Sequence, residues 1–140
     1  MPVEKLVHIV DDDDSVRRSA AFMLKHAGYR VESHISGVEF LKEAKSAERG
    51  CVLLDVRMPE MDGLEVQQEM AKRGIDMPVV ILTGHGDIAV AVRAMRAGAV
   101  NFIEKPYEKE ALLRAIEEAY ARLDRSHDRE MKAGEARIRL

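Results

Sequence analysis

The stretch LVHIVDDDD, from Leu6 to Asp14, passes from a short apolar segment directly into four consecutive acids. The segments Val52–Leu54 and Val79–Leu82 are also short and apolar, which is typical of buried parallel strands. Val31–Ile35 is more polar and suits an edge strand, and Val100–Ile103 is a fifth candidate. We therefore predict five short strands.

Segments with the spacing of amphipathic helices lie between and after these strands. They are Ser15–Ala27, Gly37–Lys45, Gly63–Arg73, Ile88–Ala97 and Lys109–Arg122. Gly28, Gly74 and Gly98 follow the first, third and fourth of them, where glycine commonly ends a helix. Because strands that alternate with helices form a parallel sheet with right-handed crossovers, the predicted fold class is α/β, with five parallel strands and five helices.

The size and composition of the chain fit one domain with a polar tail. A chain of 140 residues, of which 46% are hydrophobic, can fill a single core. Residues 124–140 contain few large apolar side chains. We therefore expect a compact domain over residues 1–123 and a linker or frayed helix over residues 124–140.

Charge and cysteine content argue against several classes of protein. A net charge of −3 argues against direct binding of nucleic acid by this domain. Cys51 is the single cysteine, which excludes an internal disulfide and a cysteine-based zinc site, and no two of the five histidines stand at metal-ligand spacing. No apolar run is long enough to span a bilayer and no signal peptide is recognisable, so we expect a cytoplasmic protein with no membrane partner.

Polar side chains stand where the predicted strands end. They are Asp11, Asp12, Asp55, Thr83 and Lys105. The carboxyl ends of the strands form the functional crevice of such sheets. Carboxylates that converge there repel one another unless a cation or a proton is present, and an oxygen-only cluster favours Mg²⁺ or Mn²⁺. The sequence therefore predicts a metal site, whereas Asp13 and Asp14 suit the N-cap and first turn of a helix.

Asp55 is the acid whose position indicates the chemistry most directly. It ends an apolar strand, and Asp62 or Gly63 fits the cap of the next helix better than Asp55 does. A carboxylate beside a divalent cation can attack a phosphoryl group and form an acyl phosphate. Lys105 precedes Pro106, where a cis peptide can turn the lysine toward the acids.

Several motifs occur in a fixed order between residues 5 and 123. They are His8–Asp12, Leu54–Pro59 with Met61–Gly63, Thr83–Asp87, Ala97–Ala99 and Phe102–Pro106. Together they resemble the receiver domain of two-component response regulators, most closely its FixJ-like branch. The resemblance implies a flavodoxin-like receiver fold, with the strand order 2-1-3-4-5 taken from the family.

The resemblance also assigns roles at the metal site. It implies that Asp55 is the phosphoacceptor and that Asp12 and Asp55 bind Mg²⁺ directly, with Mn²⁺ as a possible substitute. The backbone carbonyl of Arg57 is implied as a further ligand, and Asp11 is expected to act through a water.

The resemblance implies that a second group of residues responds to phosphorylation. Thr83 and Lys105 would contact it, and Phe102 would be the aromatic switch, at a position where many family members have tyrosine. Arg57 and His85 stand at positions that tune dephosphorylation in the family.

The partners expected from the resemblance are a cognate histidine kinase and a second copy of the chain. The phosphorylated receiver would dimerise through the face formed by the fourth helix and fifth strand. DNA would be bound only through a C-terminal output domain that is not in this chain. The tail Glu135–Leu140 resembles the linker that precedes such a domain, so we expect either a receiver fragment or a stand-alone receiver.

Two alternatives remain for the acidic segment. Asp11, Asp13 and Ser15 resemble the first motif of a haloacid-dehalogenase-type phosphatase, with Asp11 as nucleophile and Asp13 as general acid. Against it, no acidic pair follows Lys105, Asp55 would have no role and 140 residues is short for that fold. A degenerate receiver that only binds proteins would require a missing site residue, and none is missing.

Overall fold

Five parallel strands form a single sheet in a computed structural model, which describes residues 5–44, 48–84 and 86–138, with side chains described through residue 124. The strands are β1 (Leu6–Val10), β2 (Arg30–His34), β3 (Cys51–Asp55), β4 (Val79–Thr83) and β5 (Asn101–Glu104). Their order, β2-β1-β3-β4-β5, confirms the predicted α/β fold class and its topology.

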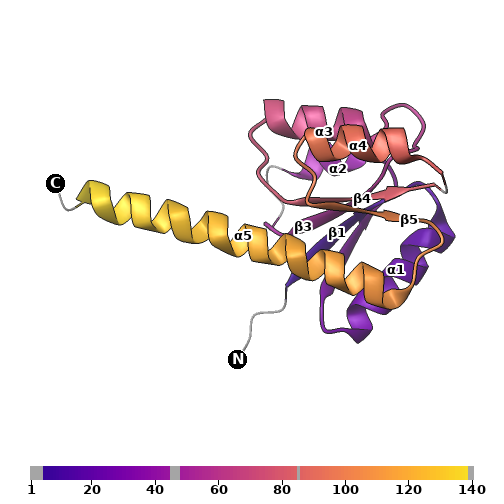
Figure 1. The fold of residues 1–140 in the computed structure, drawn as a ribbon, viewed down its shortest axis with the longest axis horizontal. Helices are drawn as coiled ribbons and strands as arrows, with labels where there is room; N and C mark the ends of the chain where they lie inside the picture. The colour runs from indigo at the N-terminus through magenta and orange to yellow at the C-terminus, as the bar shows by residue number, and fades with distance from the viewer. Residues whose placement is uncertain (1–4, 45–47, 85, 139–140) are drawn as a thin grey trace.

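Helices cover both faces of this sheet (Figure 1). They are α1 (Asp14–His26), α2 (Gly37–Ala44), α3 (Gly63–Lys72), α4 (Ile88–Arg96) and α5 (Lys109–Ile138). Helices α1 and α5 pack on one face, and α2, α3 and α4 pack on the other. Among the described residues, no helix combines the length and apolar character needed to cross a membrane.

The central strand β3 divides the core into two halves. Its side chains alternate, so that Leu54 packs beneath α2 and α3 while Leu53 packs toward α1 and α5. Every residue of β1, β3 and β4 is buried, as expected when both faces of a parallel sheet are covered. The apolar character of these strands therefore follows from their central position, and their carboxyl ends form one edge of the molecule.

The loops that follow β1 and β3 end in capped helices. Asp13 is the N-cap of α1, and its carboxylate accepts hydrogen bonds from the backbone N–H of Ser15 at 2.9 Å and Val16 at 3.3 Å. Asp62 and Glu65 form a capping box at the start of α3. Both caps confirm the predicted helix starts, and they leave Asp11, Asp12 and Asp55 outside the helices.

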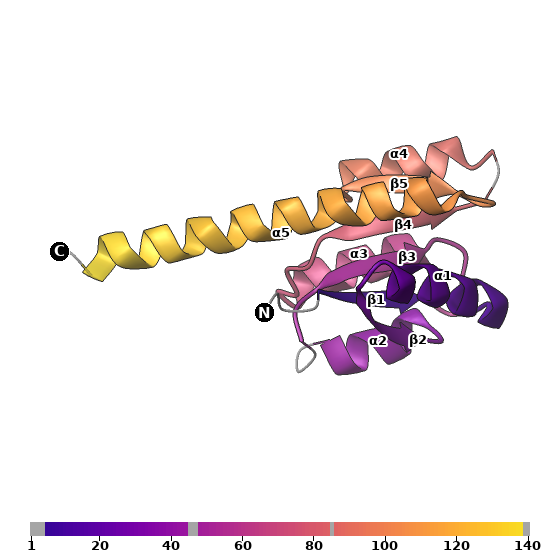
Figure 2. The ribbon, with the colours of Figure 1, turned by 90° about the horizontal axis from the view of Figure 1, so that it is seen from below.

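The last helix is longer than the sequence pattern predicts. We expected it to end at Arg122, but α5 continues to Ile138 and extends away from the sheet (Figure 2). Residues 124–138 contain no proline and many alanine, glutamate, lysine and arginine residues, which favour helix. Tyr120 is buried and Leu123 packs against the core, whereas Asp124 is exposed. This burial is compatible with a domain boundary near residue 123, which stays a prediction.

Gly63 allows α3 to start directly against the end of β3. Its N–H donates to the carbonyl of Val56 at 2.8 Å, and a Cβ at this position would lie 2.6 Å from the carbonyl oxygen of Asp55. We therefore expect Gly63→Ala to lower the free energy of unfolding by about 1–3 kcal/mol, because backbone atoms must move to make room. Urea denaturation measures this change.

Gly84→Ala is the matched control, because a Cβ at Gly84 would meet no atom within 4 Å. Equal loss of stability in the two variants would contradict the close approach of α3 to β3.

Candidate functional site

Three carboxylates converge at the carboxyl ends of β1 and β3. The register pairs Val10 with Leu54, so the residues that follow lie side by side. Carboxylate oxygens of Asp11, Asp12 and Asp55 all lie within 4.8 Å of one another. Asp11 and Asp55 are buried and Asp12 is exposed, so the cluster opens to solvent on one side.

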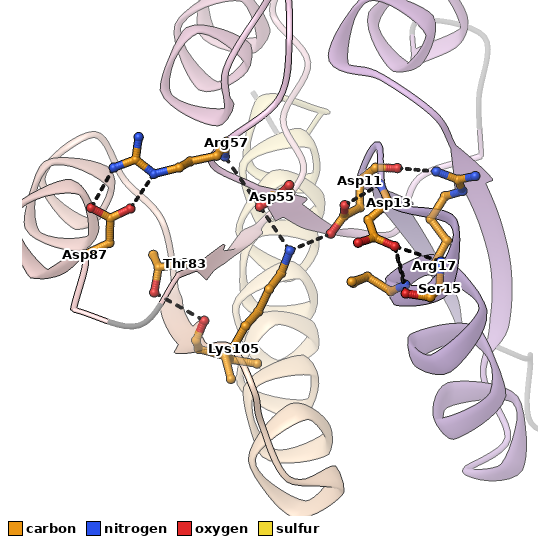
Figure 3. Close-up of polar contacts among 11 residues, drawn as sticks. Asp11, Asp13, Ser15, Arg17, Asp55, Arg57, Thr83, Asp87 and Lys105 are labelled. Atoms are coloured by element: carbon orange, nitrogen blue, oxygen red, sulfur yellow. Dashed lines mark hydrogen bonds and ion pairs between the residues drawn. The ribbon is translucent and has the colours of Figure 1, made fainter.

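Lys105 provides the positive charge at this cluster. Its Nζ donates to Asp11 Oδ2 at 3.0 Å and to Asp55 Oδ1 at 3.3 Å (Figure 3). The backbone N–H of Lys105 donates to the carbonyl of Thr83 at 2.8 Å, which fixes the lysine next to the end of β4. The Lys105–Pro106 peptide bond is cis. One ammonium therefore contacts two of the three carboxylates of the cluster.

The charges of the cluster change the pKa of Asp55. Burial and the neighbouring Asp11 carboxylate raise the pKa of Asp55 to about 6, although Lys105 opposes this shift. Burial lowers the pKa of Lys105, but its hydrogen bond to Asp11 and the charge of Asp55 outweigh that effect and raise the pKa above its usual value. The ammonium thus stays charged, while Asp55 is incompletely stabilised as a carboxylate.

Asp11 is held in place from several sides. The N–H of Asp13 donates to Asp11 Oδ1 at 2.9 Å, and the guanidinium of Arg17 donates to the Asp11 carbonyl at 2.7 Å. The N–H of Asp11 donates to the carbonyl of His34 at 3.3 Å. Arg17 could not be identified from the sequence, because a basic residue in the first turns of an amphipathic helix carries no distinguishing signal.

The side chain of Arg57 points away from the carboxylates. Its Nε donates to Asp87 Oδ2 at 2.8 Å, and its Nη2 donates to Asp87 Oδ1 at 2.9 Å (Figure 3). These bonds lower the pKa of the Asp87 carboxyl. The backbone N–H of Arg57 faces the cluster, and its nitrogen lies 3.4 Å from Asp55 Oδ1. Asp87 precedes α4, so this ion pair connects the β3–α3 loop to that helix.

Thr83 and Phe102, which were expected to respond to the phosphoryl group together with Lys105, make no hydrogen bond to the carboxylates in the part of the chain that the structure describes. Thr83 is buried, and its hydroxyl donates to the carbonyl of Ile103 at 3.5 Å. Phe102 is 36% exposed on β5. Among the described residues, Lys105 is therefore the expected reporting residue whose side chain bonds to the carboxylates. His85 lies outside the described residues.

The donor set of the cluster suits a hard divalent cation. Asp11, Asp12 and Asp55 offer oxygen atoms alone, and oxygen ligands are those that Mg²⁺ and Mn²⁺ prefer. A bound cation would also offset the repulsion that raises the pKa of Asp55. The residues present therefore fit Mg²⁺.

The five-stranded 2-1-3-4-5 sheet, with its acidic cluster at the ends of β1 and β3, was compared with protein families of known fold. A model of the response regulator receiver domain matches residues 7–117. The chain belongs to this family.

Relatives of known name refine the assignment within the family. Over 122 residues the chain is 44% identical to the transcriptional regulatory protein FixJ of Azorhizobium caulinodans, which covers 87% of this chain and 58% of that protein. It is 43% identical over 134 residues to FixJ of Rhizobium meliloti, covering 96% of this chain and 66% of the relative. The chain thus spans 58% to 66% of the length of these two relatives.

Solved structures agree with this assignment. The crystal structure of FixJ-N has a TM-score of 0.80 with 45% identity, and the match covers 84% of this chain and 94% of that one. Full-length FixJ from B. japonicum has a TM-score of 0.85 with 36% identity, covering 96% of this chain and 66% of that one. The chain is therefore a receiver domain similar to those of FixJ-like transcriptional regulators.

The raised pKa of Asp55 predicts how stability changes with pH in metal-free buffer. An unfolded aspartate ionises near 3.8, whereas folded Asp55 keeps its proton until about 6. The folded state binds more protons between these values, so the free energy of unfolding falls as pH rises through this range. We expect Asp55→Asn to be more stable than the parent by about 1–3 kcal/mol near pH 7.5, and nearly equal to it near pH 4.

Chemical denaturation in EDTA at the two pH values measures this difference. Asp124→Asn removes the same charge from an exposed position and is the matched control. A parent protein as stable as Asp55→Asn near pH 7.5 would contradict the electrostatic cost assigned to Asp55.

Proposed function

We propose that this receiver accepts a phosphoryl group on Asp55 from a phosphohistidine of a histidine kinase, in a reaction that depends on Mg²⁺. The observation that carries this proposal is the position of the Asp55 carboxylate. It is buried at the end of β3 beside Asp11, and the Lys105 ammonium lies 3.3 Å from it. Membership of the receiver family supports the same reaction.

The proposed step is a single displacement at phosphorus. A carboxylate oxygen of Asp55 forms an O–P bond while the P–N bond to the kinase histidine breaks, and the electron pair of that bond remains on the imidazole nitrogen. Loss of the group follows when water attacks phosphorus and inorganic phosphate leaves. The buried backbone around Asp55 keeps its carboxylate at one position for both steps.

The other residues of the cluster supply charge. Asp12, Asp55 and the carbonyl of Arg57 would hold Mg²⁺, with Asp11 acting through a water. Bound Mg²⁺ neutralises charge on the transferring phosphoryl oxygens. Lys105 is already within hydrogen-bond distance of Asp55 and would shift its donors to a phosphoryl oxygen.

Phosphorylation would be relayed through Thr83 to the surface of α4 and β5. The added group carries about −1.5 to −2 charges and accepts strong hydrogen bonds. The Thr83 hydroxyl would leave the Ile103 carbonyl to meet it, and Phe102 would turn into the vacated space. Ala91 and Ala94 are the buried residues of α4, so this helix makes small contacts and can move at low cost. Arg57 and His85 would tune the lifetime of the phosphorylated state.

The surface that would receive this signal carries several exposed apolar side chains, beside the exposed Arg93 and Arg96. Ile88, Val92 and Met95 are exposed at helical spacing along α4, and Phe102 is exposed on the edge strand β5. We propose that the phosphorylated form dimerises through this face. Several relatives are transcriptional regulators, so DNA would be bound by an output domain outside these 140 residues.

The alternative phosphatase mechanism fits the geometry poorly. It requires Asp13 to act as a general acid, but the Asp13 carboxylate caps α1. Hydrogen bonds from the Ser15 hydroxyl and from the backbone lower the pKa of Asp13, so it stays ionised and cannot supply a proton. This mechanism also leaves Asp55 without a role.

Phosphorylation by acetyl phosphate tests the proposed acceptor. With Mg²⁺ present we expect one covalent phosphoryl group per chain, detected by intact-protein mass spectrometry, and none in Asp55→Asn. Asp55→Asn retains the shape of the side chain and removes the nucleophilic oxygen.

Asp11→Asn separates the two mechanisms. Label that survives in Asp55→Asn and disappears in Asp11→Asn would favour the phosphatase and overturn the assignment of Asp55.

Dimerisation is tested with Val92→Asp. We expect the phosphorylated parent to dimerise, and we expect Val92→Asp to accept the phosphoryl group normally but remain monomeric, because a charge would be buried in the apolar face. Sedimentation velocity measures the mass. Phe22→Asp, on the exposed side of α1, is the control and is expected to dimerise like the parent. Dimers of phosphorylated Val92→Asp would contradict the proposed face.

A further inference from the structure

A pair of buried histidines lies on β1 and β2, beneath α2 and apart from the carboxylate cluster. His8 Nδ1 and His34 Nε2 are 3.2 Å apart, and both side chains are at least 95% buried. No two histidines stand at metal-ligand spacing in the sequence, but the parallel register brings these two, 26 residues apart, into contact. The proposed reaction does not use this pair.

Hydrogen bonds fix the protonation of both rings. His8 Nε2 lies 2.9 Å from the carbonyl of Glu48, which can only accept, so Nε2 of His8 carries the proton. The neutral His8 ring then accepts at Nδ1, and His34 must donate to it from Nε2. His34 Nδ1 carries no proton and faces Glu43 Oε2 at 3.5 Å.

We propose that His8 Nδ1, His34 Nε2 and the carboxylate of Glu32 form a binding site for a divalent transition metal ion, with Zn²⁺ as the best-suited ion. Glu32 Oε2 lies 3.6 Å from His8 Nδ1, and the three ligand atoms all lie within 4.8 Å of one another. Two nitrogen ligands of one tetrahedral zinc ion are about 3.3 Å apart. The distance between His8 Nδ1 and His34 Nε2, 3.2 Å, is close to this value.

The surroundings of each ring match those of metal-binding histidines. Such a histidine usually donates its second N–H to a carbonyl or a carboxylate, which orients the ring. His8 already donates Nε2–H to Glu48, and His34 has Glu43 facing its Nδ1. Burial lowers the pKa of both histidines, which keeps the rings neutral and able to bind a metal.

The donor set separates this site from the carboxylate cluster. Two imidazoles and one carboxylate suit Zn²⁺, Cu²⁺ or Ni²⁺, whereas the all-oxygen cluster suits Mg²⁺. Half of the Glu32 side chain is exposed, so an ion can enter from the Glu32 side, and three protein ligands leave a position for water. The proposal is independent of phosphorylation, although the carbonyl of His34 accepts the N–H of Asp11.

Zinc binding is measured by competition with a chromophoric chelator in saturating Mg²⁺, which occupies the carboxylate cluster. We expect one Zn²⁺ per chain and at least about tenfold weaker binding in Glu32→Gln. Glu110→Gln removes an exposed carboxylate from the first turn of α5 and is expected to bind like the parent. Absent binding, or equal affinity in Glu32→Gln and the parent, would overturn the proposal.

Imidazole nitrogen NMR on the parent protein tests the same site without a buried substitution. Without zinc both rings should be protonated at Nε2. When zinc binds His34 Nε2, the proton on that nitrogen must move to Nδ1 of the same ring, where the N–H can donate a hydrogen bond to Glu43. His8 keeps its proton on Nε2. A His34 ring that remains protonated at Nε2 in saturating Zn²⁺ would show that zinc binds elsewhere.

Discussion

The repulsion between the buried carboxylates of Asp11 and Asp55 is the constraint on which the rest of the site depends. The adjacent central strands β1 and β3 end side by side, so Asp11 and Asp55, which stand at their carboxyl ends, are brought close together. Lys105 reduces the repulsion but does not cancel it, so the pKa of Asp55 stays raised. A site with excess negative charge binds a cation readily, and it responds strongly when a charged phosphoryl group is added.

Two contacts connect this charged centre to α4 and β5. Thr83 bonds to the carbonyl of Ile103 on β5, and Arg57 bonds to Asp87 at the start of α4. Thr83 is the last residue of β4, and Arg57 lies two residues after Asp55, the last residue of β3. A change in charge at Asp55 therefore has a short route to α4 and β5, which expose the apolar side chains of Ile88, Val92, Met95 and Phe102.

The sequence predicted the sheet and the acidic cluster because both depend on local patterns. Short apolar runs identify the buried strands, and Asp11, Asp12 and Asp55 stand directly at their ends. The Arg57–Asp87 and His8–His34 contacts could not be predicted, since each joins residues 26 or more positions apart through the register and loop geometry of the folded chain. The length of α5 was underestimated because a polar tail rich in helix-forming residues lacks the apolar periodicity on which the prediction relied.

Asp55 is a carboxylate destabilised by burial and by the neighbouring Asp11, and a bound cation would offset this cost. Carbon-13 NMR of the Asp55 carboxyl carbon, followed through a pH titration with and without Mg²⁺, tests it most directly. We expect the pKa of Asp55 to be near 6 without the metal and distinctly lower with it. An ordinary pKa near 3.8 in both titrations would contradict the account.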